Sequence, residues 1–187
     1  MHFGHSNIIG FDKRPFINTK EMDEELIRRW NSVVTPSDSV YILGDFCWSR
    51  NSDDWIYYLN KLNGQKFLIK GNHDAKLTDK AKKKFAQICD YKEVKENGKT
   101  IILSHYPILT YRSDYRENIY MFYGHVHKTK EADLIAEMIS LIKNKPEEYW
   151  QGGVKPYANL YNVGCMLDYM DYTPRTADEI INSSKII

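Results

Sequence analysis

The sequence lacks several features that would place it in a specialised class of protein. It holds three cysteines, Cys47, Cys89 and Cys165, without any Cys-x-x-Cys pair, which excludes a zinc ribbon or a thioredoxin-like motif. No basic segment followed by an apolar run opens the chain, so we expect no signal peptide. No apolar run approaches the roughly 18 residues that span a bilayer. We therefore expect a cytoplasmic protein with reduced, mostly buried thiols and no membrane partner.

A strong charge of either sign is also missing. The formal net charge is +1 over 187 residues, so no global field attracts the chain to nucleic acid or to a membrane surface. The run KAKKKF at residues 80–85 is the local exception, and we interpret it as a solvated helix face rather than a nucleic-acid patch. The chain is long enough for a sizeable core and has no internal repeats or linkers, which predicts a single domain over residues 1–187.

What the chain does contain is an alternation of short apolar runs with amphipathic segments. Residues 18–34 predict a helix capped by Asn18 or Thr19, and residues 52–64 predict a second helix that ends at Asn63-Gly64. Residues 131–144 and 176–184 predict two more helices, and Asn97-Gly98 predicts a hairpin turn. This order favours a layered α/β fold with a mixed sheet between helices.

Four of the predicted strands end in side chains that bind metal ions well. Asp45 follows SVYILG, Asn72, His73 and Asp74 follow KFLIKG, His105 follows TIILS, and His125 and His127 follow IYMFYG. Ligands in α/β folds gather at the carboxyl ends of strands, so we expect these endings to converge. His125 and His127 are two residues apart and share one face of the chain, so they can serve two ions in one cleft.

Each of these elements alone has an ordinary explanation. A Gly-Asp pair after a strand is more often a turn, and a single histidine such as His105 is more often a hydrogen-bonded core residue. The joint occurrence of the four endings, in this order, is a stronger signal than any part. The two remaining histidines, His2 and His5, lie in the first five residues.

The blocks GDF, GNHD, SHYP and GHVH resemble the signature blocks of the calcineurin-like metallophosphoesterase family, over nearly the whole chain. The opening HFGHSNII and the tail NVGCMLDYMDYTPRTADEI look like the small stand-alone bacterial and phage members of that family. The resemblance implies an α/β/β/α-type sandwich with mixed sheets flanked by helices. The family's first block is Asp-x-His at the end of the first strand. Here His2 matches the histidine and Met1 the middle position, so we expect a strand and an aspartate to precede Met1.

The resemblance also implies two divalent metal ions. One is expected to bind the absent aspartate, His2, Asp45 and His127, and the other is expected to bind Asp45, Asn72, His105 and His125. Asp45 would then bridge the two ions. Oxygen and imidazole ligands without a thiolate favour Mn²⁺, with Fe or Zn²⁺ as alternatives.

The activity implied by the resemblance is metal-dependent hydrolysis of a phosphomonoester or phosphodiester, by attack of a hydroxide that bridges the two ions. His73 is expected on the leaving-group side as proton donor or charge stabiliser. Asp74 is expected either to orient His73 or to cap a following helix. His5 and Asn7 are expected to line the substrate side, although a surface loop is an equally good position for His5.

The sequence also bears on the substrate and on the competing classes of function. The segment GDFCWSR lacks the Asp-Arg-Gly that family members acting on phosphoproteins usually carry, which favours a small phosphoester or a nucleotide. Nucleic acid is expected only as a substrate. A non-catalytic interaction scaffold with a weakened metal site is the alternative, because one ligand is absent. A third hypothesis is a nucleic-acid-binding module built on residues 80–85. It would need aromatic side chains on the same face for bases to stack on.

Overall fold

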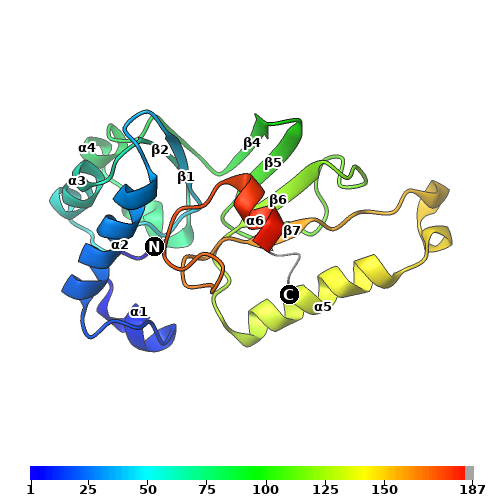
Figure 1. Ribbon diagram of the computed structural model, residues 1–187, viewed down its shortest axis with the longest axis horizontal. Helices are drawn as coiled ribbons and strands as arrows, with labels where there is room; N and C mark the ends of the chain where they lie inside the picture. Colours follow the sequence, from blue (N-terminus) through cyan, green and yellow to red (C-terminus); the bar gives the residue numbers. More distant parts are fainter. Residues whose placement is uncertain (184–187) are drawn as a thin grey trace.

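The computed structural model describes residues 1–183 of the chain (Figure 1). In chain order its elements are α1 (Ser6–Phe11), α2 (Thr19–Val33), β1 (Ser39–Ile42), α3 (Ser52–Lys61), β2 (Gln65–Ile69), the 3-10 helix η1 (Asn72–Lys76), α4 (Asp79–Lys82), β3 (Gln87–Cys89), β4 (Tyr91–Glu96), β5 (Lys99–Ser104), β6 (Ile119–Tyr123), α5 (Lys130–Asn144), η2 (Glu147–Tyr149), η3 (Gln151–Gly153), β7 (Leu160–Asn162) and α6 (Ala177–Ser183). Within these residues, no helix has the length and apolar character needed to cross a membrane.

The strands form two sheets. The first sheet has the order β1-β2-β3, and all three strands run parallel. The second sheet has the order β4-β5-β6-β7, in which β4 pairs antiparallel with β5 while β5, β6 and β7 run parallel. The chain therefore has an α/β fold with a parallel sheet and a mixed sheet, and the predicted fold class is confirmed.

The two sheets pack between layers of helices. On the outer face of the first sheet, Leu26 of α2 and Leu59 of α3 belong to one buried cluster with Leu68 of β2. Between the sheets, Ile69 of β2 meets Leu103 of β5 and other apolar side chains, including two from α6. The outer face of the second sheet packs against α5, which lies apart from α2, α3 and α4 in Figure 1. The layers follow the order of an α/β/β/α sandwich.

Local sequence signals explain the best-defined elements. Asn18 caps α2, because its side-chain oxygen accepts a hydrogen bond of 3.0 Å from the backbone N–H of Glu21. The apolar stripe of this helix is buried, as predicted from its spacing. The turn between β4 and β5 places both Asn97 and Gly98 at positive φ, at 47° and 76°. That conformation is the one a two-residue hairpin prefers, and Asn-Gly tolerates it best.

Some local predictions need correction. The helix α3 ends at Lys61, before the predicted end at Asn63-Gly64, and its N-cap is Asn51, whose side chain accepts from the backbone N–H of Asp53. The lysine run of residues 80–85 is not one solvated helix face. The helix α4 ends at Lys82, and Phe85 is buried under the following turn. Lys80 forms an ion pair of 2.8 Å with Asp53, so part of the positive charge is compensated.

A groove of about 850 Å³ runs between the sheets beside β1, and Met1 and His2 contribute to its lining. The walls are largely apolar and include Val40, Leu103 and Phe122. Residues 1–3 run parallel to the segment that follows β1, because the N–H of His2 donates to the carbonyl of Asp45 and the N–H of Phe3 to that of Phe46, both at 2.9 Å. The first residues of the chain therefore extend the first sheet at the end of this groove.

Candidate metal centre

Two loops at the carboxyl end of the first sheet are tied together by one carboxylate. Asp74 lies in η1, directly after β2, and is 1% exposed. One of its oxygens accepts hydrogen bonds of 2.8 Å from the N–H groups of Asp45 and Gly71, and the other accepts one of 3.1 Å from Phe46. Burial raises the pKa of Asp74. This carboxylate fixes the loop after β1 against the loop after β2.

The contact between these loops requires glycine. A Cβ atom at Gly71 would lie 2.3 Å from Oδ1 of Asp45, and one at Gly44 would lie 2.3 Å from Nδ1 of His105. No real Cβ approaches a neighbouring atom so closely. Gly44 also has a φ of 83°, which L side chains rarely adopt. The glycines that precede the polar strand endings therefore let three chain segments meet.

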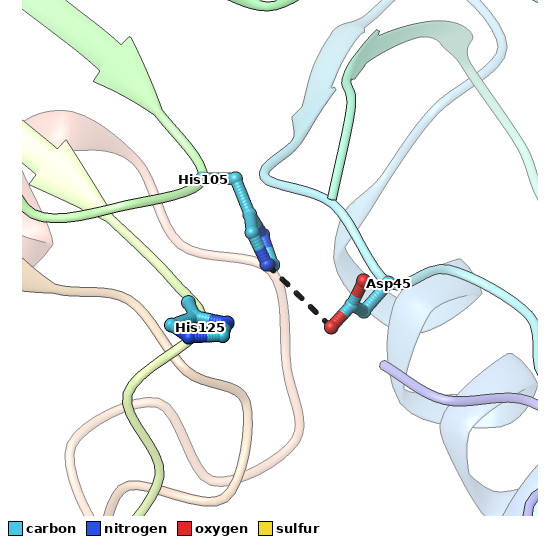
Figure 2. Close-up of side chains that lie close together, drawn as sticks. All are labelled: Asp45, His105 and His125. Atoms are coloured by element: carbon cyan, nitrogen blue, oxygen red, sulfur yellow. Dashed lines mark ion pairs between the residues drawn. The ribbon is translucent and has the colours of Figure 1, made fainter. Parts of the chain in front are cut away.

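Side chains from both sheets converge at this edge (Figure 2). Asp45 after β1, His105 after β5 and His125 after β6 each place one ligand atom within 4.8 Å of the others. The amide oxygen of Asn72 lies 3.0 Å from Nε2 of His105 and 3.1 Å from Nδ1 of His125. These are the four residues expected to hold the second ion, and the structure brings all of them together.

The polarity of these groups suits a cation. Nδ1 of His105 lies 2.8 Å from the carbonyl oxygen of Leu43, which can only accept a hydrogen bond. Burial lowers the pKa of His105, so the neutral ring carries its proton on Nδ1 and a lone pair on Nε2. That lone pair faces the oxygen of Asn72 at 3.0 Å and Oδ2 of Asp45 at 3.5 Å. Three electron-pair donors that face one another fit a divalent metal ion between them.

The residues expected at the first ion lie on the other side of Asp45. Nε2 of His2 is 3.6 Å from Oδ2 of Asp45, so this carboxylate oxygen lies between two imidazoles. Burial lowers the pKa of His2 and keeps its ring neutral. The ring of His127 lies 5.2 Å from that of His2. Asp45 thus lies between His2, expected at the first ion, and His105, expected at the second.

Three residues of this cluster adopt backbone conformations that are strained for a non-glycine residue. His2, Asp45 and His125 have φ values of 67°, 49° and 61°, in the left-handed region that non-glycine residues seldom adopt. Strained residues of this kind cluster at functional sites, where the surrounding structure holds them in place.

A cavity of about 350 Å³ opens beside the cluster. His2, His5, Asn7, Asp45, Trp48, His73, His125 and His127 are among the residues that line it. His5 caps α1, because its Nδ1 accepts a hydrogen bond of 2.8 Å from the N–H of Ile8. His73 is exposed, and its ring lies 4.4 Å from that of Trp48. The expected substrate-side residues His5 and Asn7 therefore lie in one cavity with His73.

The role expected for Asp74 needs correction. Within residues 1–183, no hydrogen bond joins its carboxylate to the imidazole of His73, because the backbone N–H groups of the two loops engage it. It therefore positions the loops that carry Asp45 and Asn72. It does not cap the helix α4, whose cap is Thr78.

Three residues beside the candidate site, Trp48, Asp12 and Arg14, were not predicted from the sequence. Trp48 contributes an indole beside His5 and His73. Asp12 lies behind His127, with Oδ1 2.7 Å from Nδ1 of that ring, and also pairs with Arg14. Burial by itself would raise the pKa of Asp12, but the hydrogen bonds from His127 and Arg14 outweigh it and lower the pKa. Asp12 and Arg14 follow a helix rather than a strand, so the strand-end rule does not find them.

Comparison with known proteins identifies the family of the chain. A family model described as calcineurin-like phosphoesterase matches residues 16–152. The chain belongs to the calcineurin-like phosphoesterase family, a family of metal-dependent phosphoester hydrolases, and the resemblance read from the sequence is confirmed.

Two relatives and one solved structure are similar to the chain, and their names state no activity. It is 36% identical over 127 residues to the uncharacterized protein MJ1445 of Methanocaldococcus jannaschii, which covers 67% of this chain and 65% of that protein. It is 35% identical over 77 residues to the Gene 66 protein of Mycobacterium phage L5, across 40% of this chain and 36% of that protein. The chain thus spans less than two thirds of these relatives. A crystal structure of the protein of unknown function AQ665 from Aquifex aeolicus matches with a TM-score of 0.64 and 29% identity, over 100% of this chain and 95% of that one.

We expect Gly71→Ala to weaken Mn²⁺ binding and to lower the free energy of unfolding by about 1–3 kcal/mol, as overpacking does. The φ of Gly71 is −95°, so the effect is steric and comes from the approach to Asp45. Gly10→Ala is the matched control, because a Cβ there meets nothing within 4 Å and α1 gains helix propensity. Calorimetric titration with Mn²⁺ and urea unfolding measure both effects. Unchanged Mn²⁺ affinity in Gly71→Ala would contradict the geometry of the loop contact.

We expect the stability of the metal-free protein to fall as the pH is lowered below about 6.5. The pKa values of His2 and His105 are lowered by burial, so in this range the unfolded chain binds protons that the folded chain does not. Each such imidazole contributes a slope of up to about 1.4 kcal/mol per pH unit. Asp74 acts in the opposite direction, since its raised pKa lets the folded form take up a proton first.

Urea unfolding in EDTA between pH 7.5 and 5 measures this slope. His105→Gln should reduce the slope by about the share of one imidazole, whatever its effect on stability at pH 7.5. A free energy of unfolding that does not change across this range would contradict the assignment of neutral, buried rings.

Proposed function

We propose that this chain hydrolyses a small phosphoester or a nucleotide with the help of two divalent ions, Mn²⁺ being the preferred metal. The observation that carries the proposal is the convergence of electron-pair donors from Asp45, Asn72 and His105 beside a cavity that His73 also lines. Membership in the calcineurin-like phosphoesterase family supports the reaction class. The cavity of about 350 Å³ lies near the lower end of small-molecule pockets, which supports a small substrate.

In this proposal, some residues bind the metal ions and His73 donates a proton. Asp45, Asn72, His105 and His125 hold one ion, and His2, Asp45 and His127 contribute to the other. When bound, the ions supply Lewis acidity that activates water and neutralises charge on the phosphoryl oxygens. His73, which is exposed in the cavity and supported by Trp48, supplies a proton to the leaving group.

Further contacts fix the positions of these residues. The backbone N–H of His73 donates to Oδ1 of Asp45 at 2.9 Å, so the proton donor and the shared ligand are mechanically joined. Asn72 is a neutral ligand and leaves more positive charge for an anionic substrate. His5 is fixed by its cap on α1 and faces the same cavity, which places it on the substrate side.

We expect the wild-type chain to hydrolyse p-nitrophenyl phosphate or bis(p-nitrophenyl) phosphate with Mn²⁺ present and not with EDTA. His73→Ala should keep its Mn²⁺ content and lose about 10²–10⁴-fold in turnover, as loss of a general acid does. The loss should be smaller with p-nitrophenol as the leaving group than with an alkyl alcohol. The adjacent variant Asn72→Ala is the matched ligand variant and should lose metal as well.

Two results would contradict these roles. Absence of Mn²⁺-dependent hydrolysis with every phosphoester tested, in a chain that binds Mn²⁺, would favour the scaffold. Loss of Mn²⁺ from His73→Ala would make His73 a ligand instead of a proton donor.

We also propose that an apolar strand ending in aspartate precedes Met1 and completes the first metal site. The groove beside β1 supports this, because residues 1–3 already pair in parallel beyond the end of β1. A segment that continued this pairing backwards would enter the groove and deliver a carboxylate next to His2. The strand would also satisfy backbone groups along β1, which is at the sheet edge within the described residues.

We expect a version that includes the natural residues upstream of Met1 to unfold at higher urea concentration and to bind Mn²⁺ at the first site more tightly than the 187-residue chain. Urea unfolding and Mn²⁺ stoichiometry compare the two versions, and the intact mass of the natural protein shows where it begins. A natural protein that begins at Met1 and binds two ions tightly per chain would contradict this completion.

A further inference from the structure

Asp12 and Arg14 form a buried charged pair directly behind the metal centre. The Asp12 side chain is 1% exposed and that of Arg14 is fully buried. Nε and Nη2 of Arg14 both donate to Oδ2 of Asp12, at 2.9 Å and 2.8 Å. Nη1 of Arg14 donates to the carbonyl oxygen of Met1 at 2.9 Å, which anchors the pair to the segment that carries His2. A buried pair of this kind is costly to assemble, so its position calls for an explanation.

The hydrogen-bond polarity of this pair determines which nitrogen of His127 carries the proton. Arg14 has only donors, and both of its contacts to Asp12 fall on Oδ2. The other oxygen, Oδ1, remains to accept from Nδ1 of His127 at 2.7 Å. With the proton on Nδ1, the neutral ring has its lone pair on Nε2. His127 lines the same cavity as His2 and Asp45.

We propose that Asp12 is a positioning residue that fixes the orientation and tautomer of His127, so that Nε2 is free to bind the first metal ion. The inference rests on the proposed metal-dependent function and assigns to Asp12 and Arg14 a task within the same site. Arg14 holds Asp12, Asp12 holds His127, and His127 presents its free nitrogen to the ion. Carboxylates that accept a hydrogen bond from the non-ligating ring N–H of a metal-bound histidine act in this way in other metal sites.

The isosteric change Asp12→Asn tests this polarity. The single amide oxygen of asparagine must face Arg14, because a guanidinium cannot accept a hydrogen bond. The amide NH₂ group then faces Nδ1 of His127 and donates to it. The ring is forced to carry its proton on Nε2, which removes the lone pair that the metal needs. We expect affinity for the first ion to fall by about 10–100-fold, the usual effect of losing such a partner.

Two further variants separate this effect from loss of a buried carboxylate. Asp23→Asn is the matched control, since Asp23 is also buried but accepts from the N–H of Gly4 and the hydroxyl of Tyr58. The double variant Asp12→Asn with Arg14→Met removes the donors that claim the amide oxygen. That oxygen can then accept from His127, and we expect the tautomer and part of the metal affinity to return.

Nitrogen-15 NMR of the imidazoles in EDTA reports the tautomer without metal, and calorimetric titration with Mn²⁺ reports affinity. We expect the proton of His127 on Nδ1 in the wild type, in Asp23→Asn and in the double variant, and on Nε2 in Asp12→Asn. Thermal unfolding in EDTA checks that each variant is folded.

Different outcomes would contradict the role of Asp12 or the proposed function. An unchanged tautomer in Asp12→Asn, or an equal loss of Mn²⁺ affinity in Asp23→Asn, overturns the role of Asp12. Equal Mn²⁺ binding by the wild type and Asp12→Asn overturns that role alone. A wild-type chain that binds no Mn²⁺ contradicts the proposed function itself.

Discussion

The contact between the loop after β1 and the loop after β2 is the constraint on which the rest of the site depends. Asp74 holds it by accepting hydrogen bonds from the backbone of Asp45, Phe46 and Gly71. The absence of a side chain at Gly71 allows the approach. Within the described residues, the buried carboxylate accepts its hydrogen bonds from these backbone N–H groups. It therefore holds the ends of two parallel strands together. Asp45 and Asn72 are ligand candidates on the two sides of this contact.

The second sheet adds its ligands to a frame that the first sheet has already fixed. His105 reaches across to the carbonyl oxygen of Leu43, so a hydrogen bond to the first sheet sets the direction of its other nitrogen. His125 and Asp45 both adopt left-handed backbone conformations. Neither lone pairs that face one another nor strained backbone stabilises an apo protein. The apolar cores on both sides of the sheets offset these unfavourable free-energy terms. This pattern is expected at sites where function opposes stability.

Much of the fold, and the convergence of the polar strand endings, could be predicted from the sequence, because both follow local rules. Apolar runs that end in Asp45, Asn72 or His105 identify strand ends, and parallel strands bring their carboxyl ends to one edge. The contribution of Asp12 could not be predicted this way. Its partner His127 is 115 positions away in the sequence, and only the tertiary structure places them together. The contacts of Asp74 could not be predicted for a related reason, since two of its three partners are backbone N–H groups of a loop, 28 and 29 residues away.

The distribution of charge around the site is consistent with the anionic substrate that we propose. The negative charge of Asp12 is balanced by Arg14, and Asp74 is shielded by backbone N–H groups. Asp45 is therefore the only ligand candidate with a negative charge among the residues assigned here, since Asn72 and the buried imidazoles are neutral. In the proposed two-ion site, Asp45 and the aspartate proposed before Met1 would carry two negative charges against the four positive charges of the ions, so an excess of positive charge would remain. That excess would lie beside a small cavity lined by His5, Phe11, Trp48 and His73, where a phosphate group could supply the missing negative charge.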